Sequence, residues 1–161
     1  MTTAYKIDKE QVIAQLNRIM ESELAGVVRY THYSLMIFGF GRIPIVSWFR
    51  GQADETLLHA QQAGEMVTHL GGHPSLAIGS LLETHHHDIG DVLRETLEAE
   101  FATLNLYYKL LEMVGGKSVP LEEYARNLIS QEELHIDEID KMLRRPGQIE
   151  VSKEVGEMAQ D

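Results

Sequence analysis

The sequence contains no cysteine, so disulfide bonds, iron–sulfur clusters and thiol nucleophiles are excluded. Any metal bound by the protein must therefore be held by carboxylate and imidazole groups. Basic residues are also scarce, because 14 lysines and arginines stand against 25 aspartates and glutamates, which gives a formal net charge of −11. This surplus of negative charge repels phosphate backbones, and we expect no nucleic-acid partner. Cations are the partners that it favours.

Long apolar runs are missing as well. No stretch approaches the roughly 20 apolar residues that a membrane helix needs, so we expect no membrane partner. The first residues, Met1 to Lys9, are too polar for a secretory signal. We therefore predict a cytoplasmic protein. Hydrophobic residues make up 43% of the chain, which is enough for one globular domain with a substantial core.

Four long segments have apolar residues at every third or fourth position, which predicts four α-helices. They cover residues 8–38, 44–70, 88–114 and 120–145. Asp8 and Asp88 are candidate N-caps for the first and third helices. Gly71 and Pro146 follow the second and fourth helices and would end them.

The lengths of the connections predict how these helices are arranged. The first and third connections are about five residues long, which makes the helices that they join antiparallel. The middle connection, from Gly71 to about His87, can run the length of the bundle, because a helix of about 27 residues spans only about 40 Å. The second and third helices would then be parallel. We assign residues 1–147 to this bundle and residues 148–161 to a polar, acidic tail that forms a short helix or is disordered.

Polar side chains interrupt the apolar stripes near the middle of the helices. Glu23 and Glu100 do so in the first and third helices, and Glu132 and His135 do so in the fourth. The second helix carries His59 near its middle. Burying an unpaired carboxylate is costly, so such groups are protonated, paired or bound to metal. Because all five lie at a similar depth, we expect them to meet in the core.

Carboxylates combined with imidazoles suit iron or manganese better than a metal that prefers thiolates. In the fourth helix, Glu132 and His135 are three residues apart and project from one face, so both reach one ion. In the second helix, Glu55 precedes His59 by one turn. Each residue taken singly has an ordinary explanation, such as an ion pair for Glu23. Their combination favours a metal site.

At these positions the sequence resembles the bacterioferritins, within the ferritin-like di-iron carboxylate family. The likeness covers about residues 8–145 and is close in the runs 16–24 and 132–137. It implies an all-α fold, a ferritin-like four-helix bundle with a long crossover between helices two and three. The family's site takes one glutamate from each of helices one and three and a Glu-x-x-His pair from each of helices two and four. Carried over, the catalytic and metal-ligand residues are Glu23, His59, Glu100, Glu132 and His135, with Glu55 as a further candidate metal ligand.

Helix two departs from the family's pattern. Thr56 stands three residues before His59, where the family has glutamate, and Glu55 stands four residues before it. A local π-bulge could bring Glu55 into the site. Otherwise Glu55 matches a family position that faces the protein cavity and takes iron in transit, and the efficiency of the site would fall. Leu57 replaces the family's haem-binding methionine, so we predict no haem unless another methionine, such as Met36, substitutes.

The resemblance implies a ferroxidase that oxidises Fe(II) at a di-iron centre within each subunit and stores the ferric product. The oxidant would be O₂ or hydrogen peroxide. Glu100 and Glu132 would be the bridging carboxylates, and His59 and His135 would each bind one iron. Storage implies a homo-oligomeric shell, of twenty-four or of twelve subunits, because a single chain has nowhere to keep mineral. The alternatives are an oxidase or peroxidase of the rubrerythrin type, and a shell subunit with a degenerate site.

Two tyrosines and a run of histidines each have two interpretations. Tyr30 matches a tyrosine that the family places beside the di-iron centre. Tyrosines on apolar stripes, such as Tyr30 and Tyr107, are nevertheless more often packing residues than hydrogen-bond donors to a metal ligand. His85–His87 precede the expected N-cap Asp88. We favour a solvated loop for this run. The alternative is a surface or metal-entry site, since adjacent imidazoles concentrate divalent ions.

Overall fold

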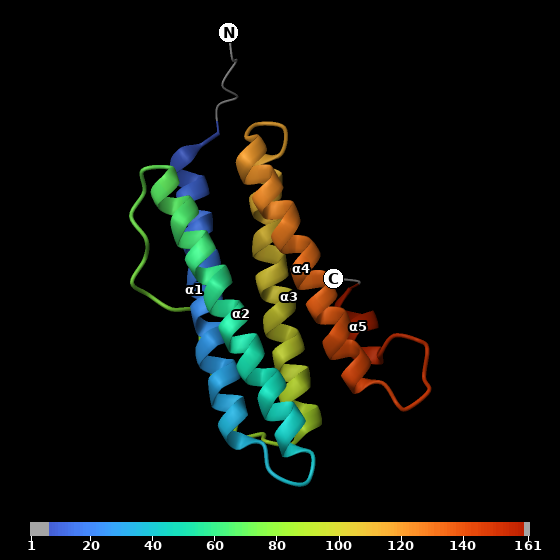
Figure 1. Ribbon diagram of the computed structural model, residues 1–161. Coiled ribbons are helices and arrows are strands. Elements are labelled where there is room, and N and C mark those ends of the chain that lie inside the picture. Colours follow the sequence, from blue (N-terminus) through green and yellow to red (C-terminus); the bar gives the residue numbers. More distant parts are fainter. Residues whose placement is uncertain (1–6, 160–161) are drawn as a thin grey trace.

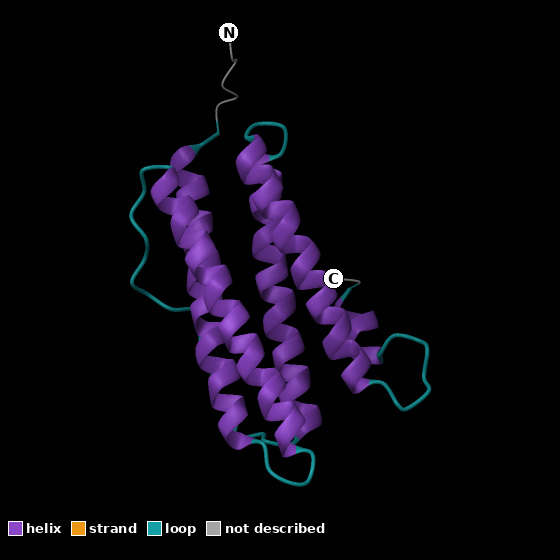
Figure 2. Cartoon of the chain, viewed as in Figure 1, coloured by secondary structure: helices purple, strands orange, loops and turns teal. Residues whose placement is uncertain are grey.

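A computed structural model describes residues 7–159, and within this range the chain forms helices and no strand (Figure 1, Figure 2). The helices are α1 (Lys9–Met36), α2 (Arg42–His69), α3 (Ile89–Val114), α4 (Val119–Leu143) and α5 (Lys153–Met158). The predicted all-α, four-helix bundle is confirmed by α1 to α4. Residues 1–6, on which the expectation about a secretory signal mainly rests, lie outside the described part. Of the helices described, none is long and apolar enough to span a bilayer.

Two antiparallel hairpins build the bundle. α1 packs along α2 and α3 packs along α4, and the two hairpins meet mainly between α1 and α3. Figure 1 shows that α2 and α3 run in the same direction, because residues 70–88 pass along the outside of the bundle from one end to the other. The predicted long crossover between helices two and three is therefore confirmed.

Local side-chain and backbone chemistry determines where the helices begin and end. Asp8 and Asp88 cap α1 and α3 as predicted, since each side chain accepts a hydrogen bond from a backbone N–H of the first turn. Gly71, with φ of +78°, turns the chain at the end of α2. The N–H groups of Gly71 and Gly72 then donate to carbonyls in the last turn of α2 at 2.9 Å, which satisfies groups that a helix end otherwise leaves unpaired.

The core of the bundle is apolar except for a polar layer near its middle. Leu16 on α1 and Ile37, the residue that follows this helix, are fully buried and lie on either side of the buried Glu23. Fully burying a large apolar side chain contributes about 1.5–3 kcal/mol. The apolar layers therefore offset the cost of enclosing carboxylates between them.

The polar tail folds back onto the bundle. Asp140 is buried in α4, where it accepts a hydrogen bond from the N–H of Ser152 at 2.6 Å and pairs with Arg144 at 2.6 Å. α5 then packs against α3, and Glu154 pairs with Arg94 at 3.1 Å. The tail thus contains a short helix, while its separation from the bundle as a region of its own stays a prediction.

Candidate metal centre

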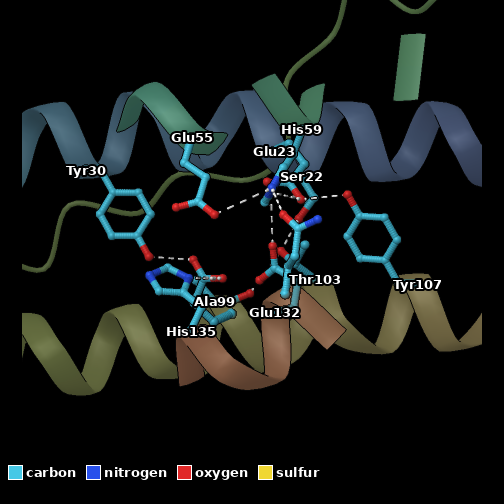
Figure 3. A network of polar contacts seen from close by, with 12 residues as sticks. Ser22, Glu23, Tyr30, Glu55, His59, Ala99, Thr103, Tyr107, Glu132 and His135 are labelled. Atoms are coloured by element: carbon cyan, nitrogen blue, oxygen red, sulfur yellow. Dashed lines mark hydrogen bonds and ion pairs between the residues drawn. The ribbon is translucent and has the colours of Figure 1, made fainter. Parts of the chain in front are cut away.

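Four helices send polar side chains into the middle of the bundle (Figure 3). They are Glu23 from α1, His59 from α2, Glu100 from α3, and Glu132 and His135 from α4. The structure therefore brings together all five residues that were expected to meet in the core. Four of them are at most 6% exposed, namely Glu23, His59, Glu100 and Glu132.

The first group of three side chains joins α1, α2 and α4. Nδ1 of His59 lies 3.3 Å from Oε1 of Glu132 and 3.7 Å from Oε1 of Glu23. Ligand atoms of all three lie within 4.8 Å of one another. Two ligands that are each about 2.1 Å from one ion lie about 3.0–3.4 Å apart in octahedral or tetrahedral coordination. This group is therefore spaced almost as a shared ion requires.

The second group joins α3 and α4 and includes one member of the first. Nδ1 of His135 lies 3.4 Å from Oε2 of Glu100, and ligand atoms of these two residues and of Glu132 lie within 4.8 Å of one another. Glu132 thus belongs to both groups, whereas Glu100 belongs to one. Of the two glutamates expected to bridge, Glu132 has the geometry for it.

Three buried atoms in these groups lack a hydrogen-bond partner among residues 7–159. They are Nδ1 of His59, Oε2 of Glu132 and Nε2 of His135. An unpaired buried polar group costs about 1–3 kcal/mol, and folded proteins contain few of them. Cations between these side chains would satisfy Nδ1 of His59 and Oε2 of Glu132, and the donor set of carboxylates and imidazoles suits iron or manganese. The residues therefore fit a pair of such ions.

Burial and mutual repulsion drive the pKa values of the three glutamates apart. Burial, followed by the charge of Glu100, raises the pKa of Glu23 to about 8. The same two causes raise the pKa of Glu132 well above its usual range. Burial acts in the same direction on Glu100, but hydrogen bonds with Glu132 and His135 outweigh it and lower its pKa to about 2. Without metal, Glu23 and Glu132 therefore hold protons at neutral pH that a divalent ion would displace.

Two tyrosines hold carboxylates of the centre in place. Tyr30 donates a hydrogen bond from its hydroxyl to Oε1 of Glu100 at 2.6 Å, and Tyr107 donates to Oε1 of Glu23 at 2.8 Å. Both tyrosines are fully buried, so they also pack in the core. Packing and donation to a carboxylate of the centre therefore hold together for both tyrosines. The partner of Tyr107 lies on another helix, and the sequence carries no signal that would identify it.

Gln131 orients the imidazole of His59. Its Oε1 lies 3.0 Å from Nε2 of His59, and an amide oxygen accepts but does not donate. The proton of a neutral His59 is therefore held on Nε2, which leaves the lone pair of Nδ1 directed toward Glu23 and Glu132. Gln131 was not expected from the sequence, because a glutamine beside Glu132 is also what an ordinary exposed helix face contains.

Helix α2 lacks a glutamate in either group. Glu55 points toward His59 (Figure 3), with Oε1 at 3.9 Å from Nε2, but its side chain is half-exposed and belongs to neither group. The π-bulge considered for this helix is absent, since Arg42–His69 is α-helical throughout. Thr56 is buried against α1, where its Cγ2 lies 2.9 Å from the position of a Cβ on Gly26. A packing residue thus occupies the position expected for glutamate.

The fold and this centre together define a four-helix-bundle protein whose interior collects carboxylates and imidazoles from all four helices. The family model of the ferritin-like domain matches residues 13–148. The chain belongs to the ferritin-like domain family, and the family resemblance inferred from the sequence is confirmed.

Individual relatives agree with this assignment. The bacterioferritin of Mycobacterium bovis and bacterioferritin BfrA of Mycobacterium tuberculosis are each 27% identical over 141 residues, which cover 82% of this chain and 83% of theirs. Among solved structures, a ferritin-like, di-iron carboxylate protein of Bacillus anthracis superposes with a TM-score of 0.80 at 22% identity, over 85% of this chain and 98% of that one. The bacterioferritin of Rhodobacter capsulatus, with a metal-free dinuclear site and haem iron, gives 0.74 at 23% identity, over 83% and 84%. These two structures share the fold.

Proposed function

We propose that the protein stores iron, by oxidising two Fe²⁺ ions at the interior centre of each subunit within a hollow homo-oligomeric shell. The observation that carries this proposal is the place of Glu132 in both groups, since it makes the two ion positions neighbours that share a carboxylate. Relatives that are bacterioferritins, and a structural neighbour described as a di-iron carboxylate protein, support the choice of iron.

Each substrate ion is bound by its own pair of residues and by a shared glutamate. Glu23 and His59 hold one Fe²⁺, Glu100 and His135 hold the other, and Glu132 lies between them. Ionised carboxylates stabilise Fe³⁺ more than Fe²⁺, because the attraction grows with the charge of the ion. The two electrons released convert O₂ and two protons into H₂O₂, or H₂O₂ and two protons into two waters. The protons displaced from the glutamates when Fe²⁺ binds are available for this step.

Glu55 takes Fe²⁺ on its way to the centre in this scheme. Its half-exposed carboxylate lies on the Nε2 side of His59, whereas Glu23 and Glu132 lie on the Nδ1 side. An acidic side chain with one end in solvent and the other near the site attracts Fe²⁺ without trapping it.

A ferroxidase assay with a matched pair of variants tests the proposal. Fe²⁺ added aerobically to the metal-free protein is expected to give ferric absorbance faster than the buffer blank does. Glu132→Gln is expected to lower the initial rate more than about tenfold, since even groups outside the coordination sphere change activity by 10–100-fold. Glu133→Gln is the control, because Glu133 is the exposed neighbour on the same helix and bonds to Tyr108. Equal rates in the two variants would contradict the proposal.

A second candidate is a shell subunit whose oxidation site is degenerate. It is favoured by Thr56, which packs against Gly26 at the position where the family pattern has a glutamate, and by the place of Glu55 outside both groups. The iron content of the purified protein distinguishes the two candidates, since two irons per chain would exclude a degenerate site. The size of the particle in solution tests the alternative of a rubrerythrin-type oxidase or peroxidase. An iron store must be a hollow particle of several hundred kilodaltons, whereas a dimer would favour the oxidase or peroxidase.

We propose no haem site in this protein. Leu57 occupies the position where the family has its haem-binding methionine, and its side chain offers no ligand atom. The absorbance of the purified protein after haem is added tests this expectation. We expect no haem band, whereas binding through Met36 would produce one.

A further inference from the structure

A second set of metal-ligand side chains lies on the outside of the bundle. It consists of His32 from α1, Glu83 from the crossover and His87, which immediately precedes the cap of α3. One ligand atom from each of the three lies within 4.8 Å of the others. Glu83 and His87 are four residues apart, whereas His32 lies far from both in the sequence, so the path of the crossover brings the pair beside α1.

The distances within this cluster are those of a small coordination sphere. Oε2 of Glu83 lies 2.8 Å from Nε2 of His32, and Oε1 of Glu83 lies 3.6 Å from Nε2 of His87. Ligands at about 2.0–2.1 Å from a tetrahedral ion are about 3.3–3.4 Å apart, a value that these two distances bracket. The carboxylate presents a different oxygen to each imidazole. A small rotation of Glu83 is therefore enough to bring one oxygen and two nitrogens around a single ion.

The two imidazole nitrogens that face Glu83 are shielded from water and have no hydrogen-bond partner among residues 7–159. The contact between His32 and Glu83 is close enough for an ion pair but does not have the geometry of a hydrogen bond. Shielded polar atoms are almost always paired in folded proteins. Two such atoms beside one carboxylate indicate that a further group joins them.

The turn before α3 selects His87 from the run of three histidines. His85 has φ of +58° and is the one non-glycine residue of the described range in the left-handed region. Its N–H donates to Oε1 of Glu83 at 2.6 Å, which holds that carboxylate against the turn. The side chains of His85 and His86 are left 81% and 64% exposed, whereas His87 turns toward α1 and is 28% exposed. The sequence favoured a solvated loop for all three histidines. That interpretation describes His85 and His86 but not His87.

We propose that His32, Glu83 and His87 bind one Zn²⁺ ion, with the fourth coordination position open to solvent. Two imidazoles and one carboxylate form a donor set typical of zinc sites that keep an open position. For such a set the general order of stability places Zn²⁺ above Fe²⁺ and Mn²⁺. Bound Zn²⁺ fastens the non-helical crossover to α1 and to the start of α3. The site is independent of the interior centre and of its proposed function.

Zinc binding in three variants of the full-length protein tests this site. Equilibrium dialysis against Zn²⁺ with metal analysis is expected to give one ion fewer per chain for His87→Ala than for the wild type. The affinity for that ion is expected to fall more than about 100-fold, beyond the effect of changes outside a coordination sphere. Glu83→Gln, which keeps the shape of the side chain, is expected to behave in the same way. His86→Ala is the matched control, because it removes the neighbouring imidazole and is expected to bind as many ions as the wild type.

Two outcomes would overturn the proposal. One is equal Zn²⁺ binding by the wild type and the two correctly folded variants, with folding checked by circular dichroism. The other is loss of the ion in His86→Ala with retention in His87→Ala. Crystals grown with Zn²⁺ provide the independent measurement, since an anomalous peak at the zinc edge is expected between His32, Glu83 and His87 and its absence there counts against the site. Because the assay compares variants of the outer cluster alone, Zn²⁺ bound at the interior centre does not affect the result.

Discussion

Three buried glutamates in the interior centre have different charges although they have the same side chain. Glu100 is ionised because Tyr30, Glu132 and His135 all contribute hydrogen bonds to it. Glu23 and Glu132 are protonated at neutral pH, since burial and the charge of Glu100 act against a second and a third negative charge. The metal-free centre is thus stabilised by protons that occupy the place of cations, and this exchange makes its stability depend on pH.

The free energy of unfolding of the metal-free protein is expected to fall as the pH rises from about 5.5 to 7.5. The folded chain keeps a proton on Glu23, with its pKa of about 8, whereas the unfolded chain releases it near the ordinary value of 4.5. The contribution of Glu23 is therefore complete below pH 4.5 and is lost as the pH rises toward 8, by about 1.4 kcal/mol per pH unit. Glu132 contributes with the same sign, and Glu100 is ionised in both states over this range.

Urea unfolding in the presence of a chelator measures this slope. Glu23→Gln is the control, because its amide resembles the protonated acid and does not titrate. Its slope is expected to be shallower than that of the wild type. A metal-free protein that becomes more stable as the pH rises over this range would be inconsistent with protonated glutamates.

Substitution of Glu55 distinguishes an entry residue from a ligand. Glu55→Gln is expected to raise the Fe²⁺ concentration needed for half-maximal oxidation severalfold, with little change in the limiting rate, because Glu55 lies outside both groups of three. Initial rates measured over a range of Fe²⁺ concentrations give both quantities. A limiting rate that falls as far as in Glu132→Gln would make Glu55 a ligand.

Functional residues could be predicted from the sequence where a polar side chain interrupts an apolar stripe. They could not be predicted where a polar side chain lies on a polar helix face. Glu23, Glu100 and Glu132 interrupt apolar stripes, and that local conflict needs no knowledge of the fold. Gln131 of the centre and His32 of the outer cluster lie on helix faces where polar side chains are common. Their partners come from elements distant in the sequence, and helical periodicity gives no information about such contacts.

At the scale of the helices, caps made most boundaries predictable. α1 and α3 begin after Asp8 and Asp88, as expected, because a short acidic side chain satisfies N–H groups of the first turn wherever the fold places it. α2 begins at Arg42, two residues before the expected start at residue 44, and its N-cap Gly41 has no side chain to cap it. The tail was harder to predict, since α5 depends on the distant Asp140, which accepts a hydrogen bond from Ser152.

The close approach of α1 and α2 can be tested with two glycines. A Cβ on Gly26 would lie 2.9 Å from Cγ2 of Thr56, a stiff, branched side chain, whereas a Cβ on Gly51 meets nothing within 4 Å. Both glycines are helical, so both alanine variants gain about 1 kcal/mol of helix propensity. Overpacking costs about 1–3 kcal/mol, so Gly26→Ala is expected to be less stable than Gly51→Ala by that amount in urea unfolding.

The double variant Gly26→Ala with Thr56→Ser checks the cause. Serine lacks the Cγ2 atom that the new Cβ would meet, so the double variant is expected to regain most of the lost stability. If it stays as unstable as Gly26→Ala, Thr56 is not the residue that limits the spacing of the two helices. The same contact explains why helix two has a threonine where the family pattern has a glutamate, since a longer side chain would have to leave this close approach.

The whole molecule joins two hairpins through a crossover, and this topology creates both candidate sites. Parallel α2 and α3 bring the middles of all four helices to one level, where the interior centre lies (Figure 1, Figure 3). The crossover that makes them parallel also brings Glu83 and His87 beside α1. Connection lengths were sufficient to predict this topology. The outer cluster could not be predicted, because a long connection has many paths along a bundle and the sequence does not specify which one it takes.

Anomalous diffraction from a crystal soaked anaerobically with Fe²⁺ tests the central claim most directly. Two iron peaks are expected in each bundle, one beside Glu23 and His59 and the other beside Glu100 and His135. Both are expected within about 2.0–2.3 Å of a carboxylate oxygen of Glu132, the usual length of such a bond. A bundle interior without iron, or irons that do not share Glu132, would contradict the account.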